Sequence, residues 1–269
     1  MLHLGRFLYA ALIVVGIALI SAAAWQFLSG QRDYAAARRE YSHLRGVYAG
    51  DAETVSHHAG PLPQDDPIPG AEPVDSGTES TKSDLRLNAR TLSQLTEINP
   101  DFAGWITIEG TAVDYPVVRG PDNDVYISTL FTGWTNPSGS IFMDYRCEQG
   151  FNGSVCILYG HNMRDGSMFA ALSHYLDPLF LTSHPFVTIT TPEGEIMMYR
   201  VVNARHTDIR NKAYSLEYSD VVAASGTFDG ASGEPYRFLI LSTCLNGSDK
   251  EARLLVFCET FTEPAPENS

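Results

Sequence analysis

Hydrophobic and polar positions change character several times along the chain, beginning with a long apolar run near the N-terminus. Residues 7–28 carry no charge and are almost wholly apolar or small, with Trp25 near the end of the run. At about 1.5 Å per residue, a helix of this length crosses the roughly 30 Å hydrocarbon core of a bilayer. Residues 31–49 then alternate small, charged and aromatic side chains at near-helical spacing. The pattern predicts a membrane anchor over residues 1–30 and a juxtamembrane helix over residues 31–49.

Two features of this region leave alternatives open. The small residues at 21–24 are typical of a cleavage site, so a cleaved signal peptide competes with an uncleaved anchor. Arg6 precedes the apolar run, whereas Arg32, Arg38 and Arg39 follow it. Counted alone, this charge distribution opposes an orientation with the C-terminus outside the cell, although large downstream domains translocate despite such a bias. The chemistry of the downstream domain therefore has to decide the orientation.

Residues 50–84 form a proline-rich stretch after the helical region. Five prolines are interspersed there with Gly, Asp, Ser and Thr. Proline fixes the backbone angle φ and removes a hydrogen-bond donor, and few apolar side chains remain to be buried. This composition predicts an extended linker.

From residue 85 to residue 262 the pattern becomes one of short apolar runs, rich in β-branched and aromatic residues and bounded by Gly, Pro or Asn. The predicted strands cover residues 104–108, 113–118, 140–143, 154–159, 186–190, 196–204, 236–242 and 254–259. The predicted helical segments lie near 85–95 and at 124–130, 167–175 and 216–224. This order predicts a mainly β domain, a closed eight-stranded barrel with peripheral and N-terminal helices, followed by a tail over 263–269.

Charge and cysteine content narrow the possible functions. The 32 acidic and 18 basic side chains give a formal net charge of -14, which argues against a nucleic-acid surface. A solvated acidic exterior explains this charge, and an acidic face that selects a cationic amine substrate is the alternative. The four cysteines show no CxxC spacing and form neither a disulfide scaffold nor a metal pattern. We therefore expect no metal and no cofactor.

Cys244 stands where an apolar strand gives way to a polar loop. A thiol in that position is held rigidly and still reaches solvent, although a single cysteine in such a setting is more often inert. An unperturbed thiol has a pKa of about 8.5 and is only a few per cent thiolate at neutral pH. To act as a nucleophile, Cys244 needs a base or a positive neighbour.

His161 and Arg253 are the candidates for these two groups. His161 follows the apolar run 155–159 through Gly160, so a loop presents it beyond the end of a strand. Arg253 begins the last apolar run, where its cation can face the oxyanion that develops during acyl transfer. We interpret the remaining candidate histidines as structural or surface residues, because they lie after a helical segment, before a proline and in a polar turn: His174, His184 and His206.

Taken together, these segments resemble the sortases, a family of cysteine transpeptidases. Residues 241–244 (Leu-Ser-Thr-Cys) and 252–256 (Ala-Arg-Leu-Leu-Val) are similar to the catalytic signature of that family. Residues 157–163 (Ile-Leu-Tyr-Gly-His-Asn-Met) are similar to its histidine segment. Residues 139–146 (Gly-Ser-Ile-Phe-Met-Asp-Tyr-Arg) and the long segment 206–236 resemble the class B branch in particular. The similarity covers about residues 99–259.

The resemblance implies a role for each matching residue. Cys244 would attack the backbone carbonyl of a sorting motif near the C-terminus of a secreted protein. His161 would pass a proton to the departing amine and take one from the incoming amine. Arg253 would hold the substrate and stabilise the tetrahedral oxyanion. The reactive form in the family is a thiolate–imidazolium pair.

The resemblance also implies a substrate groove. Class B members line it with an asparagine and an apolar residue of the helix after the second strand, and Asn123 and Ile127 occupy those places here. Ser242, two residues before the candidate nucleophile, is a further groove candidate, with a strand-end hydroxyl bonded to backbone as the alternative. Tyr214 in the long segment before the last two strands is another candidate.

The sequence therefore predicts a membrane-anchored cysteine transpeptidase with an extracellular C-terminal domain. It would cleave a sorting motif through a Cys thioester and transfer the acyl group to an amine of a cell-wall precursor or a pilin. A cysteine protease that releases surface proteins by hydrolysis is the alternative within enzymes. A noncatalytic surface-binding module is the alternative from another class.

Overall fold

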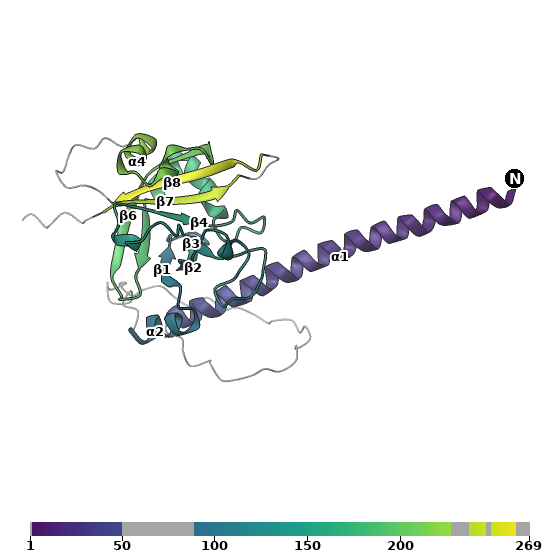
Figure 1. Ribbon diagram of the computed structural model, residues 1–269, viewed down its shortest axis with the longest axis horizontal. Helices are drawn as coiled ribbons and strands as arrows, with labels where there is room; N and C mark the ends of the chain where they lie inside the picture. The colour runs from purple at the N-terminus through teal and green to yellow at the C-terminus, as the bar shows by residue number, and fades with distance from the viewer. Residues whose placement is uncertain (1, 50–88, 227–236, 246–248, 262–269) are drawn as a thin grey trace, which may run out of the picture.

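The computed structural model describes residues 2–49, 89–226, 237–245 and 249–261 of the chain (Figure 1). The predicted linker over 50–84, the first residues of the predicted domain and the predicted tail over 263–269 lie outside these residues. The described residues downstream of the linker position form a closed β-barrel surrounded by short helices.

All eight predicted strands are present, and the barrel confirms the predicted fold class. The strands are β1 (Phe102–Thr107), β2 (Asp114–Val118), β3 (Ile141–Met143), β4 (Val155–Tyr159), β5 (Phe186–Thr190), β6 (Ile196–Asp208), β7 (Phe238–Cys244) and β8 (Ala252–Thr260). Their order around the barrel is β1-β2-β3-β4-β7-β8-β6-β5, and β5 pairs again with β1. β4 and β7 run parallel, whereas β7 and β8 form an antiparallel pair.

The near-continuous apolar runs of β4, β7 and β8 are explained by burial on both faces of the sheet. One set of alternating side chains, which includes Leu158, Leu241 and Val256, joins the main core inside the barrel. The other set, which includes Ile240 and Phe257, forms a second cluster with the helical segments that follow β6. Polar side chains begin where these strands leave the buried layers, and this is the end of the barrel that carries the candidate chemistry.

The helical segments are shorter than the sequence predicts. They are α2 (Ala89–Ile98), η2 (Val125–Ile127), η3 (Gly150–Asn152), η4 (Ala170–Leu176), α3 (Pro178–Ser183), η5 (Lys212–Ser215) and α4 (Tyr218–Ser225). The segment predicted as a helix over 124–130 is a single 3₁₀ turn, η2. It stops there because the Tyr126 carbonyl accepts from the Ser140 amide and the Ile127 carbonyl accepts from a histidine ring, instead of continuing a helical ladder.

In the second half of the domain, one further expectation was wrong and one helix was missed. β6 extends to Asp208, so His206 lies in a strand opposite Leu254 and not in a polar turn. The extension follows from pairing with the long strand β8, a contact far away in the sequence. The helix α3 was not predicted from the sequence; Asp177 caps it by accepting from the Leu179 amide, and Pro178 follows at the first helical position.

The N-terminal region forms one continuous helix, α1 (Leu2–Ala49), which projects away from the barrel at its N-terminal end (Figure 1). Its C-terminal part lies against the barrel and buries Ala37, Tyr41 and Leu44, which recur at the i, i+4, i+7 spacing of one helix face. Among the described residues, α1 is the one helix long and apolar enough to cross a membrane. It is therefore compatible with a single membrane span.

Candidate active site

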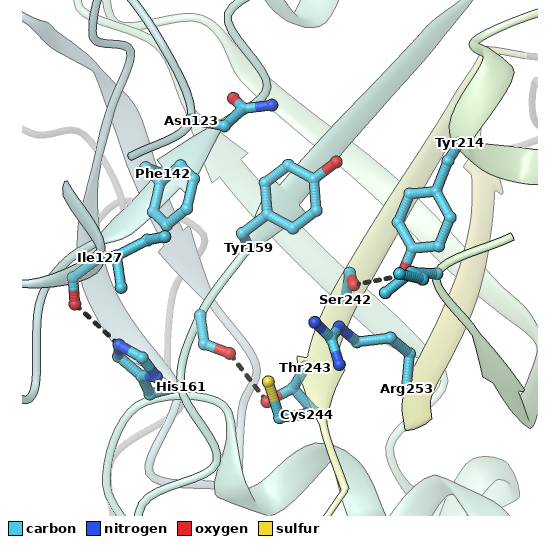
Figure 2. Close-up of a pocket in the computed structure, with 12 residues that line it drawn as sticks. Asn123, Ile127, Phe142, Tyr159, His161, Tyr214, Ser242, Thr243, Cys244 and Arg253 are labelled. Atoms are coloured by element: carbon cyan, nitrogen blue, oxygen red, sulfur yellow. Dashed lines mark hydrogen bonds between the residues drawn. The ribbon is translucent and has the colours of Figure 1, made fainter. Parts of the chain in front are cut away.

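A cavity of about 410 Å³ opens at the end of the barrel where β4 and β7 end and β8 begins. All seven candidate residues from the sequence line it, and Figure 2 shows their side chains around one hollow. They are Asn123, Ile127, His161, Tyr214, Ser242, Cys244 and Arg253. The strands bring these residues together from positions up to 130 residues apart, counted from 123 to 253.

Cys244 is the last residue of β7 and pairs with Arg253 on β8. Side chains at directly opposed positions of an antiparallel pair point to the same face, with Cβ atoms about 4.5–5.5 Å apart. Cys244 is exposed, whereas Cys147, Cys156 and Cys258 are buried, and all four thiols are free. The cavity therefore contains an accessible thiol with a guanidinium as its cross-strand neighbour.

Hydrogen bonds between β4 and β7 fix the position of His161. The Gly160 amide donates to the Ser242 carbonyl at 3.2 Å, and the buried Thr243 hydroxyl donates to the Gly160 carbonyl at 2.7 Å. The backbone of Gly160 also lies close to two side chains of the core, because a Cβ there would lie 2.5 Å from Ile141 Cδ1 and 2.7 Å from Phe169 Cδ2. His161 therefore leaves the barrel immediately beside the strand that carries the thiol.

The His161 ring is held on its far side by a backbone carbonyl. Nε2 of His161 lies 2.7 Å from the Ile127 carbonyl oxygen (Figure 2). Because a carbonyl only accepts, Nε2 must carry the proton, which leaves the lone pair of the neutral ring on Nδ1. A protonated ring would donate more strongly to the same carbonyl. The contact thus suits a group that gains and loses a proton at Nδ1.

Arg253 is oriented by the loop that precedes β8. Its Nη1 donates to the Lys250 carbonyl at 2.7 Å and to the Ala252 carbonyl at 2.9 Å. Among the described residues, its Nη2 and Nε have no hydrogen-bond acceptor. In Figure 2 the guanidinium lies between Ser242 and Cys244, where these N–H groups are available to an anion.

The thiol and the imidazole lie on opposite sides of the cavity mouth, and no hydrogen bond joins them within the described residues (Figure 2). Asn162, the residue after His161, bonds to the end of β7: its Nδ2 donates to the Cys244 carbonyl at 3.0 Å. This bond ties the loop after β4 to the end of β7. The arrangement leaves space between Cys244 and His161 for a reacting group.

The candidate groove residues form the walls of the cavity. Ile127 is 42% exposed, and Asn123 Oδ1 accepts from the Tyr145 amide at 3.0 Å. The Tyr214 and Ser242 hydroxyls lie 2.8 Å apart. The bond recorded for the Ser242 hydroxyl therefore runs to the Tyr214 side chain.

The sequence did not indicate Tyr159, nor the ion pair next to it between the buried Asp144 and the exposed Arg146. The Tyr159 hydroxyl donates to Asp144 Oδ2 at 2.8 Å, and Arg146 Nη2 pairs with the same oxygen at 2.7 Å. Burial alone would raise the pKa of Asp144, but the hydrogen bonds from Arg146 and Tyr159 outweigh it and hold that pKa below its usual range. Burial and the Asp144 charge raise the pKa of Tyr159.

Arg146 also links this network to the opposite wall. Its Nη2 donates to the Tyr214 carbonyl at 3.1 Å, and the Tyr159 and Tyr214 rings stack with centroids 6.4 Å apart. The segment 139–146 resembles the class B branch, but only the closed barrel shows that Asp144 lies beneath Tyr159. The cavity is also lined by residues that were not singled out from the sequence, namely Phe142, Thr243 and Ile209.

The candidate active site contains no cluster of metal ligands among the described residues. Throughout the part of the chain that the structure describes, no group of three or more His, Cys, Asp or Glu side chains could hold a metal ion.

Comparison with known proteins gives the family. Residues 106–261 match the model of the Sortase domain. Sortase B of Listeria monocytogenes is 33% identical over 196 residues, which is 68% of this chain and 77% of that protein. Sortase B of Staphylococcus aureus is 29% identical over 172 residues, which is 60% of this chain and 70% of that protein.

The fold agrees with a solved structure. The X-ray structure of Clostridium perfringens sortase B superposes with a TM-score of 0.57 and 28% sequence identity. The match covers 63% of this chain and 99% of that chain. This chain belongs to the sortase family of cysteine transpeptidases, which act on sorting motifs at the cell envelope, and within that family to class B.

Proposed function

We propose that α1 anchors this sortase in the cell membrane, and that Cys244, His161 and Arg253 transfer an acyl group from a sorting motif to an amine on the outer surface. One observation carries the assignment: the one exposed thiol of the four cysteines lies directly opposite Arg253 and shares a cavity with His161. An accessible thiol, a titratable base and a fixed cation are the groups that acyl transfer through a thioester requires.

In the first half-reaction the Cys244 thiolate attacks the carbonyl carbon of the scissile peptide bond. The C=O electrons move to oxygen, and the N–H groups of Arg253 Nη2 and Nε donate to the oxyanion. Collapse of the tetrahedral intermediate breaks the C–N bond, and the His161 imidazolium gives its Nδ1 proton to the departing amine. A thioester on Cys244 and a neutral His161 result.

In the second half-reaction an amine from the acceptor attacks the thioester carbonyl. His161 Nδ1 takes the proton that the amine loses, while its Nε2–H continues to donate to the Ile127 carbonyl. The C–S bond breaks, the new amide leaves, and the thiolate–imidazolium pair is restored. The same histidine thus acts first as an acid and then as a base.

The cavity fits the side chains of an extended peptide. Ile127, Phe142 and Tyr159 form an apolar wall, and the Tyr214–Ser242 hydroxyl pair lies beside it. We assign the apolar wall, with Asn123 at its rim, to the residues of the sorting motif before the scissile bond. The carbonyl to be attacked would then lie between Cys244 and Arg253.

The location follows from the substrate. A secreted protein and an amine on a cell-wall precursor or a pilin are both available at the outer membrane face. An α1 anchor with the barrel outside would place the enzyme among them. The family's activity at the cell envelope supports this orientation, and the local arginine count argues against it.

The test incubates the full chain and its Cys244→Ala variant with a mass-encoded peptide library and increasing concentrations of an amine acceptor. Two acceptors, a glycine peptide and a lysine-containing pilin-like peptide, are compared by mass spectrometry. We expect a thioester adduct on Cys244 and ligated products that increase with amine at the expense of hydrolysis. A product distribution indifferent to amine would support hydrolysis, and a folded wild type that forms no adduct would support a binding module.

A further inference from the structure

The C-terminal part of α1 lies directly against the two segments that meet at His161. Figure 1 shows this part of α1 alongside the barrel, far from the projecting N-terminal end of the helix. Leu44 is buried, and the Tyr48 ring stacks on Trp105 with centroids 4.0 Å apart. These contacts fix the helix on the barrel, and two further side chains extend from it toward the candidate active site.

The first of these, Arg38, binds the loop that carries His161. Arg38 Nη2 donates to Asp165 Oδ2 at 3.1 Å. The other oxygen of Asp165 accepts from the Ser167 amide at 3.1 Å and from the Ser167 hydroxyl at 2.6 Å. The Phe169 amide donates to the His161 carbonyl at 2.9 Å and closes the loop at its base. Asp165 therefore stands within a compact loop that begins at His161 and is held from outside by α1.

The second, Tyr41, bonds to the segment next to the carbonyl that accepts from His161. Its hydroxyl donates to the Gly139 carbonyl at 2.6 Å from a fully buried position. Burial raises the pKa of Tyr41, so its hydroxyl keeps the proton that it donates. Gly139 has φ of 54°, and a Cβ there would lie 2.4 Å from the Ile127 carbonyl oxygen. Tyr41 thus supports the backbone behind the carbonyl that accepts from His161.

The same turn of α1 makes a third contact with the barrel domain. The Glu40 carboxylate accepts from the Thr132 amide at 3.0 Å and from the Thr132 hydroxyl at 2.8 Å. Thr132 lies in the segment between Ile127 and Gly139. Within one turn, α1 therefore contacts both the loop that begins at His161 and the segment that presents its hydrogen-bond acceptor.

We propose that Arg38 and Tyr41 are positioning residues for His161, and that α1 is part of the active-site architecture in addition to being the membrane anchor. The proposal rests on the role proposed above for His161. A shift of the histidine loop relative to Ile127 would lengthen the 2.7 Å contact at Nε2 and move Nδ1 relative to Cys244. Proton transfer is more sensitive to such a shift than peptide binding is.

The exposure of the Arg38–Asp165 ion pair allows an effect on the position of the histidine loop to be distinguished from an effect on stability. The Arg38 side chain is 66% exposed and that of Asp165 is 17% exposed. An exposed ion pair contributes little to the free energy of folding. An effect of Arg38→Ala on chemistry without an effect on unfolding would therefore report loop position.

The experiment uses the full chain in detergent micelles and measures two quantities. The first is kcat and KM for acyl transfer, and the second is the pH dependence of Cys244 alkylation, which remains measurable in slow variants. The variants are Arg38→Ala, Arg38→Lys and Tyr41→Phe, with His161→Ala as the reference. Arg39→Ala and Tyr34→Phe serve as matched controls on the same helix, because neither side chain bonds to the histidine loop or to residues 127–140 among the described residues.

We expect Arg38→Ala and Tyr41→Phe to lower kcat by about tenfold with little change in KM, since a small misplacement of a catalytic group costs a factor of this order or more. Their alkylation profiles should shift toward that of His161→Ala, and Arg38→Lys should restore part of the loss. In a His161→Ala background, Arg38→Ala should change the alkylation profile no further.

The outcomes distinguish the two proposals. If His161→Ala keeps full activity and the wild-type alkylation profile, the role proposed for His161 is wrong. If His161→Ala is inactive but Arg38→Ala and Tyr41→Phe behave like Arg39→Ala and Tyr34→Phe, the positioning inference is overturned while the proposed function stands. Equal effects of Arg38→Ala with and without His161 would likewise overturn it.

Discussion

Cys244 and Arg253 face each other across the last paired position of the β7–β8 hairpin, at the mouth of the cavity. A slip of one residue in this pairing would turn one of the two side chains to the opposite face of the sheet. The register is secured further along the strands by buried pairs such as Leu241 with Val256. The barrel core therefore determines whether the thiol and the guanidinium meet.

Alkylation should reveal a single accessible thiol. Cys244 is exposed and the other three cysteines are buried, so iodoacetamide should add once to the folded wild type. We expect the adduct on Cys244 and none on folded Cys244→Ala, measured by intact mass and peptide mapping. In denaturant the variant should take up three adducts, since three cysteines remain. Rapid labelling of Cys156 or Cys258 in the folded wild type would contradict the burial described above.

Removal of the Arg253 guanidinium should impair the chemical step. Arg253→Ala should lower kcat/KM by about 10²–10³-fold, the usual cost of losing one oxyanion donor. Arg253→Lys should be intermediate, because an ammonium keeps the charge but lacks the planar fork that bonds the loop carbonyls and the substrate together. Arg237→Ala, at the opposite end of β7, is the matched control and should retain activity. An Arg253→Ala variant as active as this control would remove Arg253 from the mechanism.

Gly160 should not tolerate even a methyl group. Gly160→Ala would force Ile141 and Phe169 to move, and overpacking of this kind lowers the free energy of unfolding by about 1–3 kcal/mol. Because His161 is the next residue, activity should fall as well. Gly153→Ala is the control, since its new Cβ would lie 3.5 Å from the nearest atom. Urea unfolding and kcat/KM check both effects, and equal behaviour of the two variants would contradict the close approach.

The Asp144–Arg146–Tyr159 network should give the fold a dependence on pH. Asp144→Asn should lower the free energy of unfolding at pH 7 by about 1.5–3 kcal/mol, the range for hydrogen bonds to a charged group. The pKa of Asp144 is lower in the folded chain than in the unfolded chain, so the unfolded state binds the extra proton on acidification.

The advantage of the wild type over Asp144→Asn should therefore be complete above about pH 5 and decline as the pH falls through and below about 3.9. Urea titrations at several pH values measure this difference. Glu193→Gln, at an exposed position, is the control and should track the wild type at each pH. A difference between wild type and Asp144→Asn that does not change with pH would contradict the depressed pKa.

The hydrogen bond between Tyr214 and Ser242 should stabilise the packing of η5 against β7 at the wall of the cavity. Tyr214→Phe and Ser242→Ala should show a coupling free energy of about 0.5–1.5 kcal/mol in a double-mutant cycle of stability, since each removes the same hydrogen bond. If these residues also contact the peptide, both variants should change the ranking of peptides in the library assay. Tyr145→Phe, at a partly exposed tyrosine nearby, is the control. Additive effects of Tyr214→Phe and Ser242→Ala in the cycle would argue against a hydrogen bond between the two hydroxyls in solution.

The local pattern of apolar and polar residues was sufficient to predict the strands of the barrel and the residues of the candidate site. Runs such as 154–159 and 236–242 are apolar because both faces of those strands are buried, and this local pattern was sufficient to predict them. Cys244, His161 and Arg253 could be singled out because each stands where such a run ends and because the surrounding residues resemble a family signature. Their roles remain predictions.

The contacts that hold these residues in place could not be predicted from the local pattern. The Ile127 carbonyl beside His161, Asp144 beneath Tyr159, and the contacts of Arg38 and Tyr41 all join segments that are distant in the sequence. Local pattern cannot specify such contacts, because they depend on strand register, barrel closure and the side of the barrel on which α1 packs. The same long-range pairing extended β6 past His206 and reduced the predicted helix over 124–130 to one turn, because groups elsewhere in the fold bonded their backbone.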